Sequence, residues 1–259
     1  MRLSEVARVA GRRPRDSQLS DPGKTPVDRS RWGDGAARDG NAALACPRDR
    51  ATEHHEFFHK PVPVAMIALI LASGSSIRRT LLEAVGLEFS VERPGVDEDA
   101  LKAGFDGGSE QLATLLAEAK ALAVAARVPD AFVIGSDSIA ECDGTRFDKP
   151  RDREEAATHL RFFSGKPMAI VSAVVLARGE MVEWRHAERT LLSVRPLSET
   201  FIAAYLDAEW PAVGHCAGVF RMEGRGATLF QAVEGSHFTV LGLPLLPLLG
   251  ALRERGVMA

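Results

Sequence analysis

The segment from Met66 to Leu82 constrains the fold of this chain more than any other. It reads as an apolar strand, a Gly/Ser turn, two adjacent arginines and the start of an amphipathic helix. The first N–H groups of a helix lack partners within it, and the helix dipole is positive there, so such a turn is a natural anion site. Arg78 and Arg79 fall in or near the first helical turn, where a cation is unfavourable. They therefore indicate a strongly negative ligand, with phosphate the obvious candidate.

Bulk composition favours a soluble globular protein. The chain has 259 residues, of which 46% are hydrophobic, which is ample for a buried core. Its net charge of -3 argues against a general nucleic-acid binder. No apolar run approaches the roughly 20 residues that cross a bilayer, so we expect no membrane association. The three cysteines form no C-x-x-C pair, which fits a cytoplasmic location.

Two parts of the chain differ in character. Residues 1–65 are rich in Arg, Asp, Gly and Pro and show no sustained apolar period. We interpret them as an N-terminal extension that is either disordered or the result of a start codon assigned too far upstream of Met66. Both explanations stay open. Residues 66–259 form the organised domain.

Within that domain, apparent helices and strands alternate, which indicates an α/β fold. Leu112, Leu115, Leu116, Ala119 and Leu122 recur at helical spacing after Ser109, which we expect to cap the helix, and Lys120 lies beside this stripe. The remaining expected elements are strands at 89–93, 132–139, 168–177, 181–185 and 188–194, two further strands flanking Glu223-Gly-Arg-Gly226, and helices from Asp152 to Phe163, from Ser198 to Asp207 and after Gly242-Leu-Pro244.

Asp137 is the strongest single candidate for chemistry. It interrupts an otherwise apolar strand, and a buried carboxylate costs several kcal/mol unless it is paired, metal-bound or protonated. The alternative is a structural Asp that accepts backbone hydrogen bonds at the end of the strand. The residue type alone leaves both readings open.

Five further polar residues have a functional and a structural interpretation. Ser73 either caps a helix or contacts a phosphate, and Glu98 is either solvated or a metal ligand. Lys120 and Lys149 are either surface lysines or anion ligands. Glu223 is either a turn acid or an acceptor for the edge of a nucleobase.

In order and spacing, these features resemble the Maf family of nucleotide pyrophosphatases, from Met66 to about Gly256. The fold that this resemblance implies is an elongated α/β protein with a mixed sheet flanked by helices and two lobes around a central cleft, as in Maf and ITPase-like proteins. The matching pieces are Leu71-Ala-Ser-Gly-Ser75, Arg78-Arg79-Thr-Leu-Leu82, Val96-Asp-Glu98, Lys120 on its helix, Ile134-Gly-Ser-Asp137, Asp148-Lys-Pro150, Ser164-Gly165, Cys216-Ala-Gly218, Glu223-Gly224, Glu234-Gly235 and Gly242-Leu-Pro244.

The resemblance also implies an activity. Members of that family cleave nucleoside triphosphates between the α and β phosphates, with a divalent cation, Mg²⁺ or Mn²⁺, as cofactor. Asp137 would accept the proton of the attacking water and, with Glu98, hold the metal. The residues that would surround the triphosphate substrate are Ser73, Arg78, Arg79, Lys120 and Lys149. Homodimers occur among such proteins, and the oligomeric state of this chain stays open.

Base preference is less determined. Two features are similar to the branch of the family that acts on 7-methyl-GTP. One is an extra residue between the serines of the turn and the arginine pair, and the other is Glu223-Gly224. Two positions depart from that branch: Ile77 replaces an aromatic residue able to stack on a methylated base, and Ser138 replaces a Gln. Of these three expected base-selecting positions only Glu223 agrees, so a modified purine is favoured without being fixed.

An alternative function comes from another class. A phosphate pocket can sense nucleotides without hydrolysing them, and such a regulatory protein would affect septum formation without turnover. The presence of Asp137 with both lysines favours catalysis, because a sensor needs no base beside the phosphate.

Overall fold

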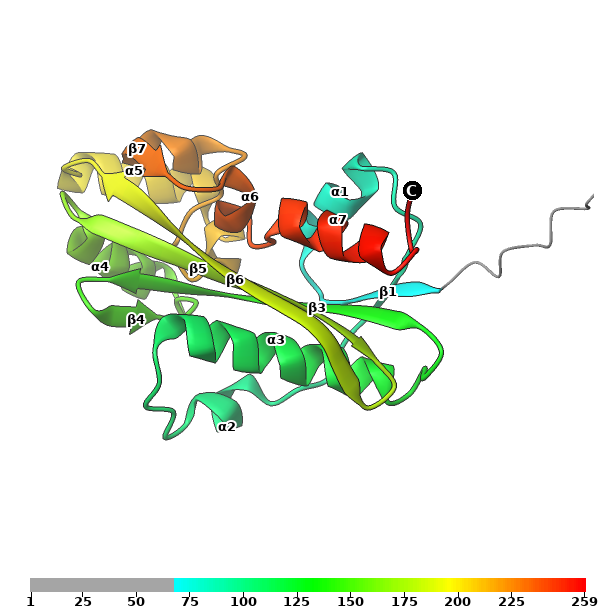
Figure 1. Cartoon of the computed structure of the whole chain (residues 1–259). Coiled ribbons are helices and arrows are strands. Elements are labelled where there is room, and N and C mark those ends of the chain that lie inside the picture. Colours follow the sequence, from blue (N-terminus) through cyan, green and yellow to red (C-terminus); the bar gives the residue numbers. More distant parts are fainter. Residues whose placement is uncertain (1–67) are drawn as a thin grey trace, which may run out of the picture. The chain divides into compact units, whose positions relative to one another are not determined.

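A computed structural model describes residues 68–259, and Figure 1 shows their arrangement. The expected boundary after residue 65 lies outside the described residues. Seven α-helices, two 3-10 helices and seven strands follow one another along residues 68–259: β1 Leu69–Ala72, α1 Ser76–Ala84, β2 Ser90–Glu92, α2 Glu98–Lys102, α3 Ser109–Ala125, β3 Phe132–Cys142, β4 Thr145–Phe147, α4 Arg153–Phe163, β5 Pro167–Arg178, β6 Met181–Val194, α5 Glu199–Glu209, η1 Ala212–His215, η2 Arg225–Leu229, β7 Phe230–Glu234, α6 His237–Val240 and α7 Leu245–Glu254.

The strands form one mixed sheet. Its order is β2-β1-β3-β5-β6-β7, with β4 paired to β3. The β1 strand runs parallel to both β2 and β3, whereas the other pairings are antiparallel. The long strands β3, β5 and β6 extend along the whole described part (Figure 1). The predicted α/β fold with an elongated mixed sheet is confirmed.

Helices at the two ends of the long strands define two lobes. In the first lobe, α3 packs on one face of β1, β3 and β5, and α1 and α7 pack on the other face. In the second lobe, α4 and α5 pack together with β4 and the opposite ends of β5 and β6. Figure 1 shows α3 below the sheet, α7 above it and α4 with α5 at the far end.

The packing of α3 differs from the predicted apolar stripe. Its buried face carries the small residues Ala113, Ala117 and Ala121, and Lys120 lies on this face instead of beside it. The cause is a close approach to the sheet: a Cβ atom on Gly135 would lie 2.2 Å from the Ala117 carbonyl oxygen. Small side chains on both elements permit this approach and bring Lys120 down onto β3.

Three other predictions of local structure were wrong. Gly108, and not Ser109, is the N-cap of α3, because the Ser109 hydroxyl donates to Glu141 instead. The two strands expected at 181–185 and 188–194 are one strand, β6, whose pairing with β5 continues through Ala187. No strand lies directly before Glu223 in the part of the chain that the structure describes, where a turn leads into η2.

The helix starts predicted at Asp152 and Ser198 are confirmed. Each side chain accepts a hydrogen bond from the backbone N–H three residues on, which satisfies a donor that the helix leaves free. Within residues 68–259, no helix combines the length and the apolar character needed to cross a membrane.

Candidate active site

A break in strand pairing exposes one edge of β3. The β5 strand covers the other edge from Val133 to Cys142. On the exposed edge, β1 pairs only as far as Gly135 and β4 only from Ala140 onward. Residues 136–139 therefore have no strand neighbour on this edge, and Asp137 and Ser138 lie within the break. A cleft of about 1310 Å³ opens here, with walls from both lobes.

The Gly/Ser turn forms one wall of this cleft. Ser73 is only 5% exposed, and its hydroxyl oxygen accepts from the Ser75 backbone N–H at 3.2 Å. No other atom lies within 4 Å of where a Cβ atom on Gly74 would be, so the turn leaves open space beside the start of α1. Ser75 gives no side-chain cap to α1, so its side chain leaves the first N–H groups of that helix to another partner.

The two arginines of α1 lie in different surroundings. Arg78 is 9% exposed, and its guanidinium donates to acceptors of the protein itself. Burial lowers its pKa, although the charges of Asp137 and Glu98 oppose this shift. The Arg79 side chain is 56% exposed and lies 3.5 Å from the Glu83 carboxylate, outside the cleft wall. The structure brings only Arg78 to the cleft.

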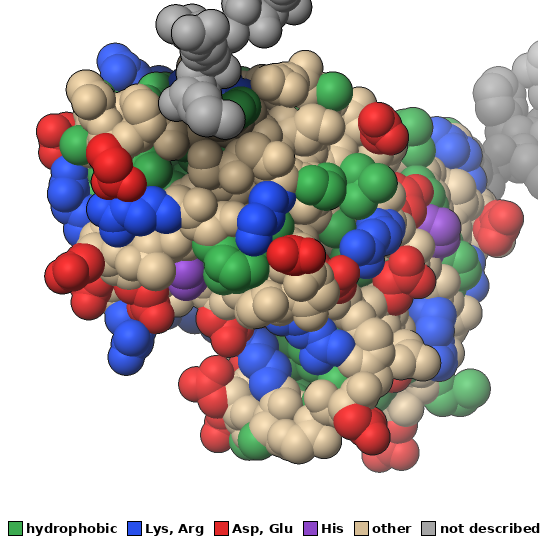
Figure 2. Space-filling model, turned by 90° about the vertical axis from the view of Figure 1, so that its left-hand side faces the viewer, with side chains coloured by type: hydrophobic (Ala, Val, Ile, Leu, Met, Phe, Trp, Pro, Cys, Tyr) green, Lys and Arg blue, Asp and Glu red, His purple; other side chains and the backbone are tan. Residues whose placement is uncertain are grey.

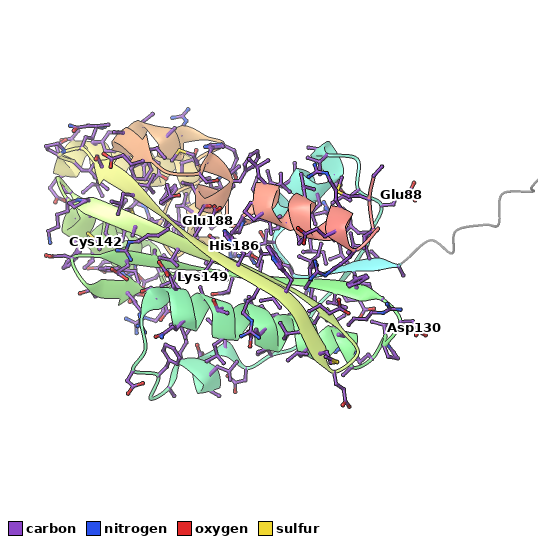
Figure 3. All side chains as sticks on the ribbon, viewed as in Figure 1. Glu88, Asp130, Cys142, Lys149, His186 and Glu188 are labelled. Atoms are coloured by element: carbon purple, nitrogen blue, oxygen red, sulfur yellow. The ribbon has the colours of Figure 1, made fainter. Side chains whose placement is uncertain are left out.

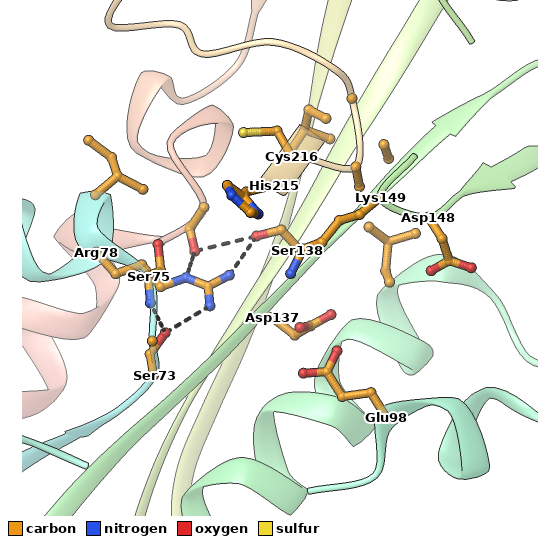
Figure 4. Close-up of a pocket in the computed structure, with 18 of the residues that line it drawn as sticks. Ser73, Ser75, Arg78, Glu98, Asp137, Ser138, Asp148, Lys149, His215 and Cys216 are labelled. Atoms are coloured by element: carbon orange, nitrogen blue, oxygen red, sulfur yellow. Dashed lines mark hydrogen bonds between the residues drawn. The ribbon is translucent and has the colours of Figure 1, made fainter. Parts of the chain in front are cut away.

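Asp137, Lys120 and Glu98 form a charged cluster on the opposite wall. Lys120 Nζ lies 2.6 Å from Asp137 Oδ1 and 2.7 Å from Glu98 Oε1. The Lys120 and Asp137 side chains are almost fully buried, whereas the Glu98 side chain is 37% exposed. Figure 4 shows the Asp137 and Glu98 carboxylates next to each other on this wall. The positive charge of Lys120 thus offsets the repulsion between the two carboxylates. An uncharged residue at this position would not do so.

Charge also controls the ionisation of Glu98. Burial acts to raise the pKa of its carboxyl, but the hydrogen bond and charge of Lys120, with the charges of Lys102 and Lys149, outweigh burial. The pKa of Glu98 therefore lies below its ordinary value. Glu98 is ionised at neutral pH and can serve as an anionic ligand.

Two further lysines line the cleft near Asp148. Lys149 is exposed and follows β4. Lys102 Nζ lies 2.6 Å from Asp148 Oδ1, and this contact with the nearby carboxylates raises the pKa of Lys102 against the effect of burial. The sequence analysis missed Lys102. Its position four residues after Glu98 on a short helix is the signal, because i and i+4 side chains share one helix face.

The three expected base-selecting positions all line the cleft. Ile77 is half-buried and Glu223 is exposed, and both line the cleft. Ser138 also lines it, but its hydroxyl is bonded to neighbouring side chains. Arg221, which the sequence analysis missed, lies on the same wall and donates to the buried Glu209 carboxylate at 2.8 Å. A carboxylate buried to 6% exposure beneath a cleft residue holds that guanidinium in one place.

Charges are mixed on this side of the molecule. On the face that Figure 2 shows, Lys and Arg side chains lie among Asp and Glu side chains and do not form one broad basic surface. Opposite charges are therefore interspersed on this face.

The Asp137 and Glu98 carboxylates fit a divalent cation. No group of three or more His, Cys, Asp or Glu residues suited to a metal occurs among residues 68–259. Mg²⁺ and similar hard cations, however, use one or two carboxylates and take their other ligands from water and phosphates. Two facing carboxylates, each with one oxygen not bonded to Lys120, meet that requirement.

Comparisons with known proteins identify a family and several similar relatives. Residues 68–255 match the family model described as Maf-like protein. The 7-methyl-GTP pyrophosphatase of Rhizobium etli is 43% identical over 193 residues, which cover 73% of this chain and 97% of the relative. The nucleoside triphosphate pyrophosphatase of Paramagnetospirillum magneticum is 44% identical over 190 residues, covering 72% and 98%. A solved nucleoside-triphosphatase / dITP/XTP pyrophosphatase from Mycobacterium abscessus is similar at 17% identity and a TM-score of 0.38, over 73% of this chain and 97% of that one.

Proposed function

The chain belongs to the family of Maf-like proteins, and on that basis we propose that it hydrolyses nucleoside triphosphates to a nucleoside monophosphate and pyrophosphate. The observation that carries this proposal is the position of Asp137. It lies in the break of the sheet, bonded to Lys120, across a cleft whose opposite wall is the Gly/Ser turn.

Asp137 has the chemistry of a general base for water. A water oxygen attacks the α-phosphorus, its proton passes to the Asp137 carboxylate, and the bond from the α-phosphorus to the bridging oxygen breaks. The electron pair of that bond leaves with pyrophosphate. Lys120, at 2.6 Å, orients the Asp137 carboxylate before the proton arrives.

The cations of the cleft neutralise the substrate. A triphosphate carries several negative charges, and attack by water requires that they be compensated in the transition state. Lys149 and Lys102 line the cleft and would contact phosphate oxygens, as would the N–H groups at the start of α1. Ser73 supports this turn through its bond with the Ser75 backbone.

Glu98 and Asp137 would hold a Mg²⁺ or Mn²⁺ ion together with phosphate oxygens. Such an ion, when bound, supplies additional neutralisation of the phosphates. Against the effect of burial, Lys120, Lys102 and Lys149 lower the pKa of Glu98, so its carboxylate is ionised and available to such an ion.

Glu223 and Arg221 suit a guanine-type base. A carboxylate accepts two hydrogen bonds from adjacent N–H donors, which guanine offers on one edge, and a guanidinium donates to a neighbouring carbonyl. 7-Methyl-GTP, which the relative from Rhizobium etli is named for, is therefore among the substrates that we propose. Ile77 offers no aromatic ring for stacking on such a base.

Turnover in ¹⁸O-labelled water tests the reaction. The full chain is incubated with Mg²⁺ or Mn²⁺ and a panel of normal and methylated triphosphates, and the products are separated by mass. We expect pyrophosphate without label and a monophosphate with label, because water attacks the α-phosphorus. Label in pyrophosphate would place the attack elsewhere. Tight nucleotide binding without turnover would favour the sensing protein instead.

A further inference from the structure

Four acceptors from three segments surround the guanidinium of Arg78. Nε donates to the Gly242 carbonyl at 2.8 Å, and Nη1 donates to the Ser136 carbonyl at 2.8 Å and to Ser73 Oγ at 3.4 Å. Nη2 donates to Ser138 Oγ at 3.1 Å. Figure 4 shows the guanidinium between Ser73 and Ser138, with Asp137 lying apart from it toward Glu98.

Arg78 occupies the break in the sheet. Because β1 ends at Gly135 in the register of β3, the Ser136 carbonyl receives no strand partner on that edge, and Arg78 supplies the missing donor. A buried carbonyl without a donor is unfavourable, because it loses the hydrogen bond that water gives it in the unfolded chain. Arg78 thus bonds to β3 on both sides of Asp137, at the residue before it and the residue after it.

The direction of its hydrogen bonds fixes the Ser138 hydroxyl in contact with Arg78 and Ser172. Ser172 Oγ donates its hydrogen to the Thr239 carbonyl at 2.8 Å, so in the contact between Ser138 and Ser172, also 2.8 Å, Ser138 must be the donor. The Ser138 oxygen can then only accept, and it accepts a hydrogen bond from Arg78 Nη2. Ser138 has no hydrogen to offer to a substrate.

The remaining donor capacity of Arg78 is small. A guanidinium has five N–H groups, and strong phosphate binding uses two of them in parallel. Four are directed at Gly242, Ser136, Ser73 and Ser138, which leaves one on Nη2. Arg78 therefore cannot present a bidentate fork to a phosphate without breaking its bonds to β3.

We propose that Arg78 and Ser138 form a clasp that fixes the Asp137 segment of β3 against the Gly242 loop. They are positioning residues and do not bind the substrate. This inference rests on the proposed function, because it assigns Asp137 the role of base. It replaces the expectation that Arg78 surrounds the triphosphate and that Ser138 selects the base.

Kinetics of Ser138→Ala and Arg78→Lys test the clasp. Misplacement of a reacting group by about 1 Å can cost about 100-fold in rate, so we expect kcat to fall at least tenfold while KM changes by less than about threefold. In Ser138→Ala the order of preference among triphosphates should stay that of the wild type. Lys149→Ala is the comparison variant, since an exposed phosphate ligand should raise KM instead.

Two measurements separate positioning from loss of folding. Circular dichroism and the melting temperature identify folded variants, and guanidinium ion at millimolar concentration should restore part of the kcat of a folded Arg78→Ala variant. The affinity of a non-hydrolysable α,β-methylene triphosphate should change by less than about threefold in Ser138→Ala and Arg78→Lys, because neither binds substrate.

Opposite results would overturn the clasp. A raised KM with an unchanged kcat, an altered order of triphosphates in Ser138→Ala, or tenfold weaker analogue binding would show that these residues contact substrate. Absence of guanidinium rescue in a folded Arg78→Ala variant would also contradict positioning. If the wild-type chain binds the analogue but hydrolyses none of the normal or methylated triphosphates, the proposed function fails, and the analogue affinities alone decide on the clasp.

Discussion

Lys120 Nζ lies 2.6 Å from Asp137 Oδ1, and both side chains are almost fully removed from solvent. The same ammonium lies 2.7 Å from the Glu98 carboxylate. A single lysine thus bridges two carboxylates within one cluster. The contact depends on the packing of α3, because small residues bring the helix close to Gly135 of β3.

Removal of Lys120 should both destabilise the fold and change the ionisation of Glu98. Lys120→Met leaves the buried Asp137 carboxylate without a partner, which costs about 3 kcal/mol of unfolding free energy. The pKa of Glu98 should rise, because Lys120 is what holds it down. Chemical denaturation and NMR titration of the Glu98 carboxyl measure these effects.

A double variant provides the control for that prediction. Lys120→Met combined with Asp137→Asn removes the unpaired charge, so it should be more stable than Lys120→Met alone. Equal stabilities of the single and double variants would mean that Asp137 gains nothing from its cation.

The close approach of α3 to β3 predicts a large effect of one methyl group. In Gly135→Ala the new Cβ would lie 2.2 Å from the Ala117 carbonyl oxygen, so the helix must move, and we expect a loss of about 3 kcal/mol. Gly250→Ala in α7 is the matched control. No atom lies within 4 Å of its Cβ position, so helix propensity should make it neutral or about 0.5–1 kcal/mol stabilising. Denaturation midpoints that are equal for the two variants would refute the packing argument.

Glu141 should contribute a pH-dependent part of stability. Hydrogen bonds from Arg189 and Ser109 hold the pKa of the Glu141 carboxyl below its ordinary value. A depressed carboxyl pKa stabilises the fold above the unfolded pKa of about 4.3, and the contribution disappears as pH falls through the lower folded pKa. Glu141→Gln should therefore lose about 1 kcal/mol at neutral pH, and the difference from wild type should vanish in acid.

Denaturation series at several pH values measure this difference. A gap between wild type and Glu141→Gln that persists unchanged at low pH would mean that ionisation of Glu141 is not its source.

The α/β class and several local elements could be predicted from the residues because their signals are local, whereas the elongated mixed sheet and the cleft were implied by the family resemblance. The Gly/Ser turn, the apolar strand around Asp137 and the helix caps at Asp152 and Ser198 each depend on neighbouring residues. The structure then placed Asp137 in one cleft with that turn. Glu98 and Lys120 lie in the same cluster as Asp137.

The remaining features depend on long-range packing. Arg78 and Arg79 are adjacent in sequence, and only the orientation of α1 separates the buried one from the exposed one. The buried side of α3 follows its small residues, which an apolar stripe does not reveal, so Lys120 was expected beside it. Ser138 acquires its partners from β5 and α1, far away in sequence.

Asp137→Asn tests the central claim most directly. The amide keeps the size of the side chain but accepts a proton poorly, so kcat for triphosphate hydrolysis should fall by about 100- to 10,000-fold. Asp130→Asn is the control, since Asp130 lies in an exposed loop at the end of the molecule away from Lys149 (Figure 3). It should retain the wild-type kcat. Wild-type turnover by a folded Asp137→Asn variant would contradict the assignment of Asp137 as the base.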